Sequence, residues 1–209
     1  MDHQPGPAIR PQENWRDRLI GLAARHADWV VGYADEVWRS RLAQPAMHAW
    51  GTPRLHAKAQ AKDDPQPKAL ACYGLLRTDQ DQVLLRFVEG GPVSRITTAF
   101  LAWVAHRLAK DGKRVWVLVW DNAAWHVSRA VRAWIGTHNR TVRRTGGVRI
   151  LVCRSPVKSP WLNPIEPRWL HGKRAIVEPD RTLTAHELMD RAHRHLGCEP
   201  LKPLNQHVL

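Results

Sequence analysis

The stretch VWVLVWDNAAWH, residues 115–126, joins six consecutive apolar residues to an aspartate, Asp121. An unbroken apolar run of this kind is typical of a central strand that is buried on both faces of a sheet. A second apolar run, WVVGYA at residues 29–34, is followed directly by Asp35 and Glu36. Sites in α/β sheets form where neighbouring strands end. The sequence therefore predicts an α/β fold with an acidic site at one edge of its sheet.

The other elements of a mixed sheet can be located around these two strands. Residues 69–77 and 82–88 are strand-like runs separated by the polar turn TDQD, which is typical of an antiparallel hairpin. A further strand is expected at residues 148–153. Apolar residues at helical intervals predict helices within 13–26, 92–113, 128–138 and 184–196, and another after the prolines of 159–169. A hairpin beside βα units implies a mixed sheet flanked by helices.

The expected boundaries give one domain of ordinary size, between two short terminal parts. Residues 1–27 are a tail and a short helix, residues 28–197 are the domain, and residues 198–209 are a loose tail. Between the elements, residues 39–68 carry four prolines and are expected as a loop. The basic segment NRTVRRTGG, residues 139–147, is also expected as a loop.

The chain is strongly basic. Its 209 residues have a formal net charge of +13 and are 44% hydrophobic, which is enough for a core. A basic surface usually binds nucleic acid or an anionic membrane, although a preference for arginine in a GC-rich genome would also raise the charge. No apolar run approaches the roughly 18 residues of a membrane span. Nucleic acid is therefore the favoured partner, and no membrane is expected.

The cysteines and the N-terminus indicate a reducing compartment. Cys72, Cys153 and Cys198 are far apart and odd in number, with no spacing typical of a zinc site. The first residues contain no apolar segment of the kind found in secretory signals. We expect reduced thiols in a cytoplasmic protein.

The two aspartates suggest metal chemistry. Asp35 and Asp121 would repel one another at adjacent strand ends unless a divalent cation lay between them. Two such ions about 4 Å apart can activate a water or a 3′-hydroxyl in phosphodiester chemistry. A basic chain with this arrangement would be a nuclease or a strand-transfer enzyme. The alternative is that each aspartate is only a turn former or a helix cap.

Three motifs carry a family resemblance. VWVLVWDNAAWH is followed by SPWLNPIEPRW at residues 159–169 and preceded by ADEVW at residues 34–38. In this order they resemble the catalytic domain of DDE transposases, above all the bacterial insertion-sequence 630 family, which is related to the mariner transposases. The resemblance covers residues 28–196. It implies a ribonuclease H-like fold with a mixed five-stranded sheet, and metal-dependent cleavage and transfer of DNA strands at insertion-sequence ends.

The resemblance also implies a set of catalytic residues. Asp35, Asp121 and Glu166 match the three acids, and they would bind two Mg²⁺ ions, for which Mn²⁺ would substitute. Asp35 is preferred to Glu36 because the family places the ligand on the aspartate. Side chains alternate along a strand, so only one member of this pair would face the site. The separation of Asp121 and Glu166 is longer than the mariner relatives usually have.

Further residues near these motifs are candidates for supporting the acids or contacting DNA. These are Asn122, His126, Asn163, Lys173, Arg143, Arg144, Arg154 and Lys158. Each also has an ordinary structural alternative: a turn for Asn122, packing for His126 and solvation for the cations. Trp169 is expected to anchor its helix in the core.

The three prolines of SPWLNPIEPRW explain how Glu166 could be held. Asn163 can cap a helix, and Pro164 suits its first position, where the missing N–H costs nothing. Glu166 would then lie in the first turn, where the helix dipole favours its ionised form. Pro167 is tolerated only this early, and it biases Glu166 away from helical geometry, so the helix could begin later.

The expected partners follow from the resemblance. Full-length transposases of this family read the inverted repeats of their element with an N-terminal helix-turn-helix region, which one helix cannot make. We therefore expect either a separately encoded helix-turn-helix part or a truncated copy of the transposase. We also expect a homodimer on double-stranded DNA and association with the bacterial nucleoid. Two alternatives stay open: a catalytically silent DNA-binding relic, and another ribonuclease H-like nuclease.

Overall fold

A computed structural model describes residues 10–42, 63–155, 163–177 and 181–205 of the chain. Its centre is a five-stranded sheet with the strand order β3-β2-β1-β4-β5. β1 pairs antiparallel with β2, and β2 with β3, whereas β1–β4 and β4–β5 are parallel. The strands are β1 Trp29–Ser40, β2 Ala69–Arg77, β3 Gln82–Val88, β4 Val115–Trp120 and β5 Arg149–Arg154. The predicted mixed five-stranded α/β fold is confirmed.

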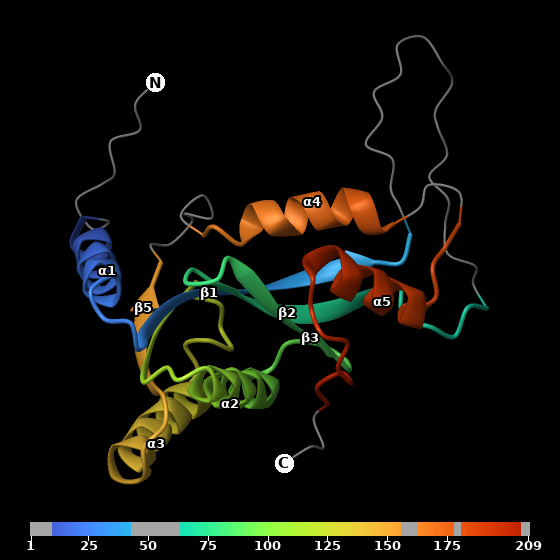
Figure 1. The fold of residues 1–209 in the computed structure, drawn as a ribbon. Helices are drawn as coiled ribbons and strands as arrows, with labels where there is room; N and C mark the ends of the chain where they lie inside the picture. Colours follow the sequence, from blue (N-terminus) through green and yellow to red (C-terminus); the bar gives the residue numbers. More distant parts are fainter. Residues whose placement is uncertain (1–9, 43–62, 156–162, 178–180, 206–209) are drawn as a thin grey trace.

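Helices cover both faces of the sheet, so that the domain has three layers (Figure 1). On one face lie α1 Arg10–Ala23, α4 Glu166–Ile176 and α5 Ala185–Leu196, and on the other α2 Ser94–Lys110 and α3 Arg129–Thr145. None of the described helices is long and apolar enough to cross a membrane.

β4 confirms the expectation of a central strand that is buried on both faces. Trp116 and Leu118 pack into the core beneath α2 and α3, whereas Val117 and Val119 pack into the core beneath α1, α4 and α5. All four side chains are at most 1% exposed. Burying each aliphatic side chain of this kind contributes about 1.5–3 kcal/mol, so both layers are held to the same strand.

β1 is longer than its apolar run predicts. Its parallel pairing with β4 ends at Tyr33, opposite Val119, but its antiparallel pairing with β2 continues to Ser40. Asp35 and Glu36 therefore lie within a strand, not after its end. They lie just past the point where β1 loses β4 as a neighbour, so one side of the strand opens beside them.

The loop predicted for the basic segment of residues 139–147 is wrong for most of its length, because residues 139–145 belong to α3. α3 continues to Thr145 and ends at Gly146, whose φ of 82° suits glycine. Tertiary contacts explain the extension. The Asn139 side chain donates to the carbonyl of Ile150 and accepts from its N–H, both at 2.8 Å, which fixes this polar end of α3 to β5.

The residues after Gly197 were expected to be loose, but residues 198–205 pack along the edge strand β3. The N–H of Leu204 donates to the carbonyl of Phe87 at 2.7 Å, and the N–H of Glu89 donates to the carbonyl of Leu204 at 2.8 Å. The Leu204 side chain is 8% exposed. This segment therefore covers part of an edge that would otherwise be unpaired.

Candidate active site

The three predicted acids come from β1, from the residue after β4 and from the start of α4. Asp35 lies two residues beyond the last β1–β4 pair, at Tyr33 and Val119. Asp121 directly follows β4, and Glu166 is the first residue of α4. The fold thus brings three sequence-distant carboxyl groups to the same end of the central strands.

Asp35 points toward α4, where it has an unusual environment. The indole Nε1 of Trp169 donates a hydrogen bond to Asp35 Oδ2 at 2.9 Å. The pKa of Asp35 is raised to about 7, first by burial and then by the charges of Glu166 and Glu36, against the lowering effect of the Trp169 bond. Carboxyl groups gathered in this way repel one another, and a cation between them would relieve the repulsion.

A glycine makes room for the indole that holds Asp35. Gly74 on β2 pairs with Asp35 across the sheet. A Cβ added at Gly74 would lie 2.2 Å from Cη2 of Trp169. The guanidinium of Arg39 also contacts this indole: it lies 5.3 Å from the centroid of the Trp169 ring, within the range of a cation–π contact. Trp169 is the core anchor that was expected, and it also contacts a candidate catalytic acid.

Asp121 is held from the other face of the sheet. Both ring nitrogens of His126 donate: Nδ1 to Asp121 Oδ1 at 2.7 Å, and Nε2 to Glu36 Oε1 at 2.5 Å. The side chains of His126 and Glu36 are 1% and 7% exposed, whereas that of Asp121 is 57% exposed. The imidazole also stacks on Trp120, with 4.3 Å between ring centroids. A buried histidine therefore ties an accessible carboxylate to a buried one.

The contact of His126 with Asp121 and Glu36 changes the pKa of the imidazole and of Asp121. Burial would lower the pKa of His126, but its bonds to Asp121 and Glu36 outweigh burial and raise that pKa to about 9. The bond to His126 in turn lowers the pKa of Asp121 below its usual range. At neutral pH the imidazolium of His126 therefore lies between Asp121 and Glu36.

Glu36 is the residue that the sequence interpretation passed over. Alternation along β1 sends Asp35 toward α4 and Glu36 toward the opposite layer, where His126 lies. Only one member of the pair was expected to face the site; Asp35 faces α4, and Glu36 reaches Asp121 through His126 from the other layer. The spacing of Glu36 and His126 in the sequence carries no signal for their contact, because it depends on the pairing of β1 with β4.

The start of α4 differs from the predicted cap. The helix begins at Glu166 with Ile165 as its N-cap, two residues after the predicted cap, as the bias of Pro167 allowed. The buried Asn163 still makes a bond of the predicted kind, because its Oδ1 accepts from the N–H of Ile165 at 3.5 Å, and its Nδ2 donates to the carbonyl of Ala34 at 3.5 Å. Pro167 occupies the first turn, where it is tolerated. Asn163 thus connects the start of α4 to β1 directly beside Asp35.

The remaining predicted residues are spread over the molecule. Asn122 donates to the carbonyl of Ser155 at 2.9 Å and so ties the segment after β4 to the end of β5. Lys173 is exposed on α4. Arg143 and Arg144 lie in the last turn of α3, which returns to the end of the sheet opposite Asp121, because β4 and β5 are parallel. The two arginines therefore do not flank the acids.

Two other candidate cations complete this set. Arg154, the last residue of β5, is half-buried near the same end as Asp121. Lys158 lies outside the described residues.

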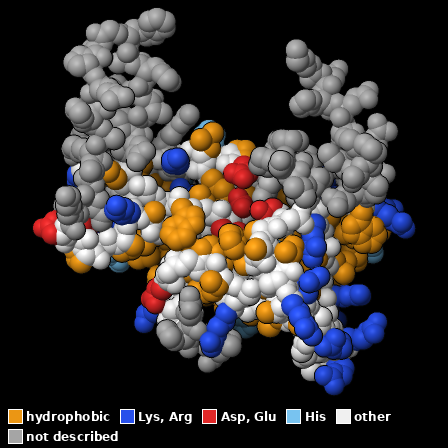
Figure 2. Space-filling view, turned by 180° about the vertical axis from the view of Figure 1, so that it is seen from behind, with side chains coloured by type: hydrophobic (Ala, Val, Ile, Leu, Met, Phe, Trp, Pro, Cys, Tyr) orange, Lys and Arg blue, Asp and Glu red, His pale blue; other side chains and the backbone are white. Residues whose placement is uncertain are grey.

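The described residues contain no group of three or more histidine, cysteine, aspartate or glutamate side chains arranged to hold a metal ion. The donor chemistry nevertheless fits a hard divalent cation, because carboxylate oxygens are the ligands that Mg²⁺ and Mn²⁺ favour. Glu166 raises the pKa of Asp35 by its charge, which indicates that these two carboxyl groups lie close enough to interact. Figure 2 shows acidic side chains gathered near the centre of one face of the molecule.

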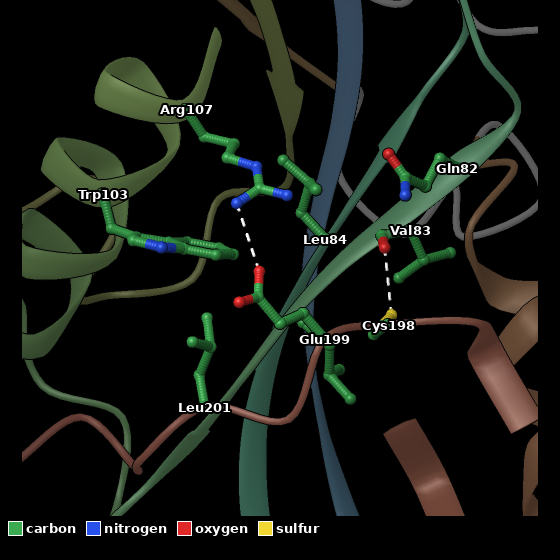
Figure 3. Close-up of a pocket in the computed structure, with 9 residues that line it drawn as sticks. Gln82, Val83, Leu84, Trp103, Arg107, Cys198, Glu199 and Leu201 are labelled. Carbon is green, nitrogen blue, oxygen red and sulfur yellow. Dashed lines mark hydrogen bonds and ion pairs between the residues drawn. The ribbon is translucent and has the colours of Figure 1, made fainter. Parts of the chain in front are cut away.

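A small hollow elsewhere in the domain does not belong to this site. It is lined by residues of β3, by Trp103 and Arg107 of α2 and by the segment around Cys198, and it includes the Arg107–Glu199 ion pair of 3.2 Å (Figure 3). Its volume of about 20 Å³ has room for about one water molecule. None of the three predicted acids lines it.

The fold and the acids together define a class of protein. A mixed five-stranded sheet in the order 3-2-1-4-5 with flanking helices is a ribonuclease H-like domain. Here it carries one acid directly after β4 and another on β1, just past its pairing with β4. The sequence profile of the DDE superfamily endonucleases matches residues 33–189, and the chain belongs to this family. No curated protein matches the chain.

Solved structures agree with this class. The chain is similar to the Mos1 transposase in a paired-end complex with the left transposon end, with a TM-score of 0.64 and 16% identity over 95% of this chain and 57% of that one. It is also similar to the catalytic domain of Mos1 mariner transposase, with a TM-score of 0.57 and 15% identity over 95% of this chain and 86% of that domain. The chain thus spans little more than half of the longer Mos1 chain. At these identities the likeness is one of fold.

Proposed function

We propose that this domain cleaves DNA at the ends of an insertion sequence of the 630 type and transfers the released strands to target DNA. The observation that carries the proposal is the convergence of Asp35, Asp121 and Glu166 on one end of the central strands in a chain of the DDE endonuclease family. The order of the motifs around these acids supports the insertion-sequence assignment.

We propose Mg²⁺ as the natural cofactor, with Mn²⁺ as a substitute, and Asp35, Asp121 and Glu166 as its ligands. A related paired-end complex of the Mos1 mariner protein contains Mn. When bound, two such ions would polarise the phosphodiester and lower the pKa of the attacking water or 3′-hydroxyl.

The chain's own residues would hold the carboxylates in place for this chemistry. Trp169 donates to Asp35 from α4, and His126 donates to Asp121 from beneath. Partners that orient ligands in this way are worth about 10–100-fold in metal affinity or activity. Glu166 enters the site as the first residue of α4.

The DNA partner and its assembly are also proposals. The similar Mos1 structures include a complex with a transposon end and a strand transfer complex. Together with the net charge of +13, they support double-stranded DNA as the substrate. We propose residues 28–197 as the catalytic body, a homodimer on DNA as the working assembly, a separately encoded helix-turn-helix part for recognition of the ends, and a location at the bacterial nucleoid.

A cleavage assay tests the enzyme assignment. The protein is incubated with a duplex that contains the element end and with Mg²⁺ or Mn²⁺, and strand scission is followed on a denaturing gel. We expect Asp35→Asn, Asp121→Ala and Glu166→Gln each to abolish metal-dependent scission, while Glu199→Gln, which changes an exposed carboxylate that pairs with Arg107 of α2, leaves it intact.

Two alternatives predict different outcomes of the same assay. A silent relic would bind the duplex without cutting it, so wild type and Asp121→Ala would behave alike. Another ribonuclease H-like nuclease would cut an RNA–DNA hybrid or a branched junction in preference to the element end.

A further inference from the structure

The outward surface of α3 carries a row of arginines, which we call the arginine ridge. All five of its guanidinium groups belong to exposed residues. They are Arg129, Arg132, Arg140, Arg143 and Arg144. Figure 2 shows a group of Lys and Arg side chains at the lower right, on the same face as the acidic side chains near the centre.

The ridge follows from helical geometry. At about 100° per residue, the five arginines fall within roughly one third of the helix circumference. Gly136 lies midway in the same sector, so no large side chain stands between the first two arginines and the last three. The opposite side of α3 packs against the sheet through Val131 and Ile135. One helix therefore separates an apolar face from a purely basic one.

The ridge has no compensating acids. α3 contains no aspartate or glutamate, and none of the five arginines makes an ion pair among the described residues. Other arginines of the chain are paired: Arg41 with Asp64, and Arg77 with Asp79 and Asp111. Like charges three or four residues apart on a helix are destabilising. An anionic partner would remove that repulsion.

The ridge begins beside the candidate active site and leads away from it. Asp121 and His126 precede Ser128, whose side chain caps the first turn of α3 through the N–H of Val131. From Arg129 to Arg144 the helix rises about 22 Å, which is about seven base pairs of duplex at 3.4 Å each. A duplex that lies along α3 would therefore have one end at the acids.

We propose that the arginine ridge binds the phosphate backbone of duplex DNA without reading its sequence, and so holds the stretch of DNA that leads away from the acidic site. The proposal rests on the proposed function only for the identity of the polyanion. Arginine suits this task because its planar guanidinium can bind a phosphate through two hydrogen bonds.

The test compares salt dependence in two matched triple variants. The ridge variant carries Arg132→Gln, Arg140→Gln and Arg143→Gln. The control variant removes the same charge outside α3. It carries Arg25→Gln, Arg114→Gln and Arg194→Gln, all at exposed positions. Binding to a random-sequence duplex is measured by fluorescence anisotropy without divalent metal at several salt concentrations, and circular dichroism checks that each variant is folded.

We expect the ridge variant to lower the slope of log K against log salt by about 2 to 3, since each neutralised phosphate contributes about 0.9 to it. The control should change the slope by less than 1. Equal slopes for the two variants would overturn the proposal. Polyglutamate serves as a second polyanion, and a ridge variant that lost binding to polyglutamate but bound the duplex unchanged would also overturn it.

The outcome is separable from that of the proposed function. Binding is measured without metal, so a protein that never cuts DNA still reports on the ridge. Conversely, metal-dependent scission that depends on Asp121 can persist even when the two triple variants bind DNA alike.

Discussion

Gly74→Ala offers a sharp test of how the site is built, because it adds a single methyl group behind a candidate catalytic acid. The new Cβ would lie 2.2 Å from Cη2 and 2.5 Å from Cζ2 of Trp169, and 3.1 Å from the side chain of Ile165. The indole must therefore retreat by about 1.2 Å to reach an ordinary contact of 3.4 Å. Trp169 is part of α4, so its displacement also disturbs the bond to Asp35 and the position of Glu166.

Two magnitudes follow from this displacement. Overpacking a filled core costs about 1–3 kcal/mol. For a chain of this length, each kcal/mol lowers Tm by about 2–4 °C. A misplacement of about 1 Å at a catalytic group can cost about 100-fold in rate. We expect Gly74→Ala to lose about two orders of magnitude of metal-dependent cleavage while the protein stays folded at 25 °C.

The assay pairs calorimetry with the cleavage assay and has a matched control. Gly21→Ala adds the same methyl group to α1, where nothing lies within 4 Å of the new Cβ. Alanine is the better helix former by about 0.5–1 kcal/mol, so this variant should be slightly stabilised and fully active. Trp169→Phe removes the indole N–H together with the two atoms that Gly74→Ala would contact.

The double variant decides whether the reasoning is right. In the Trp169→Phe background, Gly74→Ala should cost much less stability than it does in the wild type, because the clashing atoms are gone. Strictly additive losses of unfolding free energy would refute the proposed contact, since residues that touch show coupled effects. Full activity of Gly74→Ala would refute the link from Trp169 to Asp35.

Three further predictions concern other contacts. Glu36→Gln should raise the Mn²⁺ concentration needed for half-maximal binding by about 10–100-fold, because Glu36 holds His126, which in turn holds Asp121. Electron paramagnetic resonance measures this binding, and an unchanged affinity would leave Glu36 without a role at the site. Burial lowers the pKa of His193 below its usual value of about 6.5, so the unfolded chain takes up the proton first and stability should fall as the pH drops below about 6.5. In urea unfolding, His193→Phe should flatten this fall, and an unchanged slope would contradict it. Thr184→Ala should lose about 1 kcal/mol of unfolding free energy by removing the capping box of α5, whereas a neutral effect would mean that the cap is not formed in solution.

The sequence by itself determined those features that depend on local pattern. The apolar run of β4 specified a strand buried on both faces, since six residues suit a buried strand and are too few for a typical buried helix. Thr184 and Glu187 have the sequence spacing of a capping box, and Ser128 directly precedes a helical pattern; the structure contains both caps. Caps and runs of this kind are short-range, because the groups that satisfy one another lie within four residues.

Only the tertiary structure decided the features that depend on distant partners. β1 runs on to Ser40 because β2 pairs with it, although its own apolar run stops at Ala34. The Asn163 side chain bonds the carbonyl of Ala34 on β1 as well as the N–H of Ile165, and Glu36 contacts His126 across 90 residues of chain. A periodic pattern reports which face of an element is buried, but not which residue lies against it. That information resides in strand order and register, which the whole core sets together.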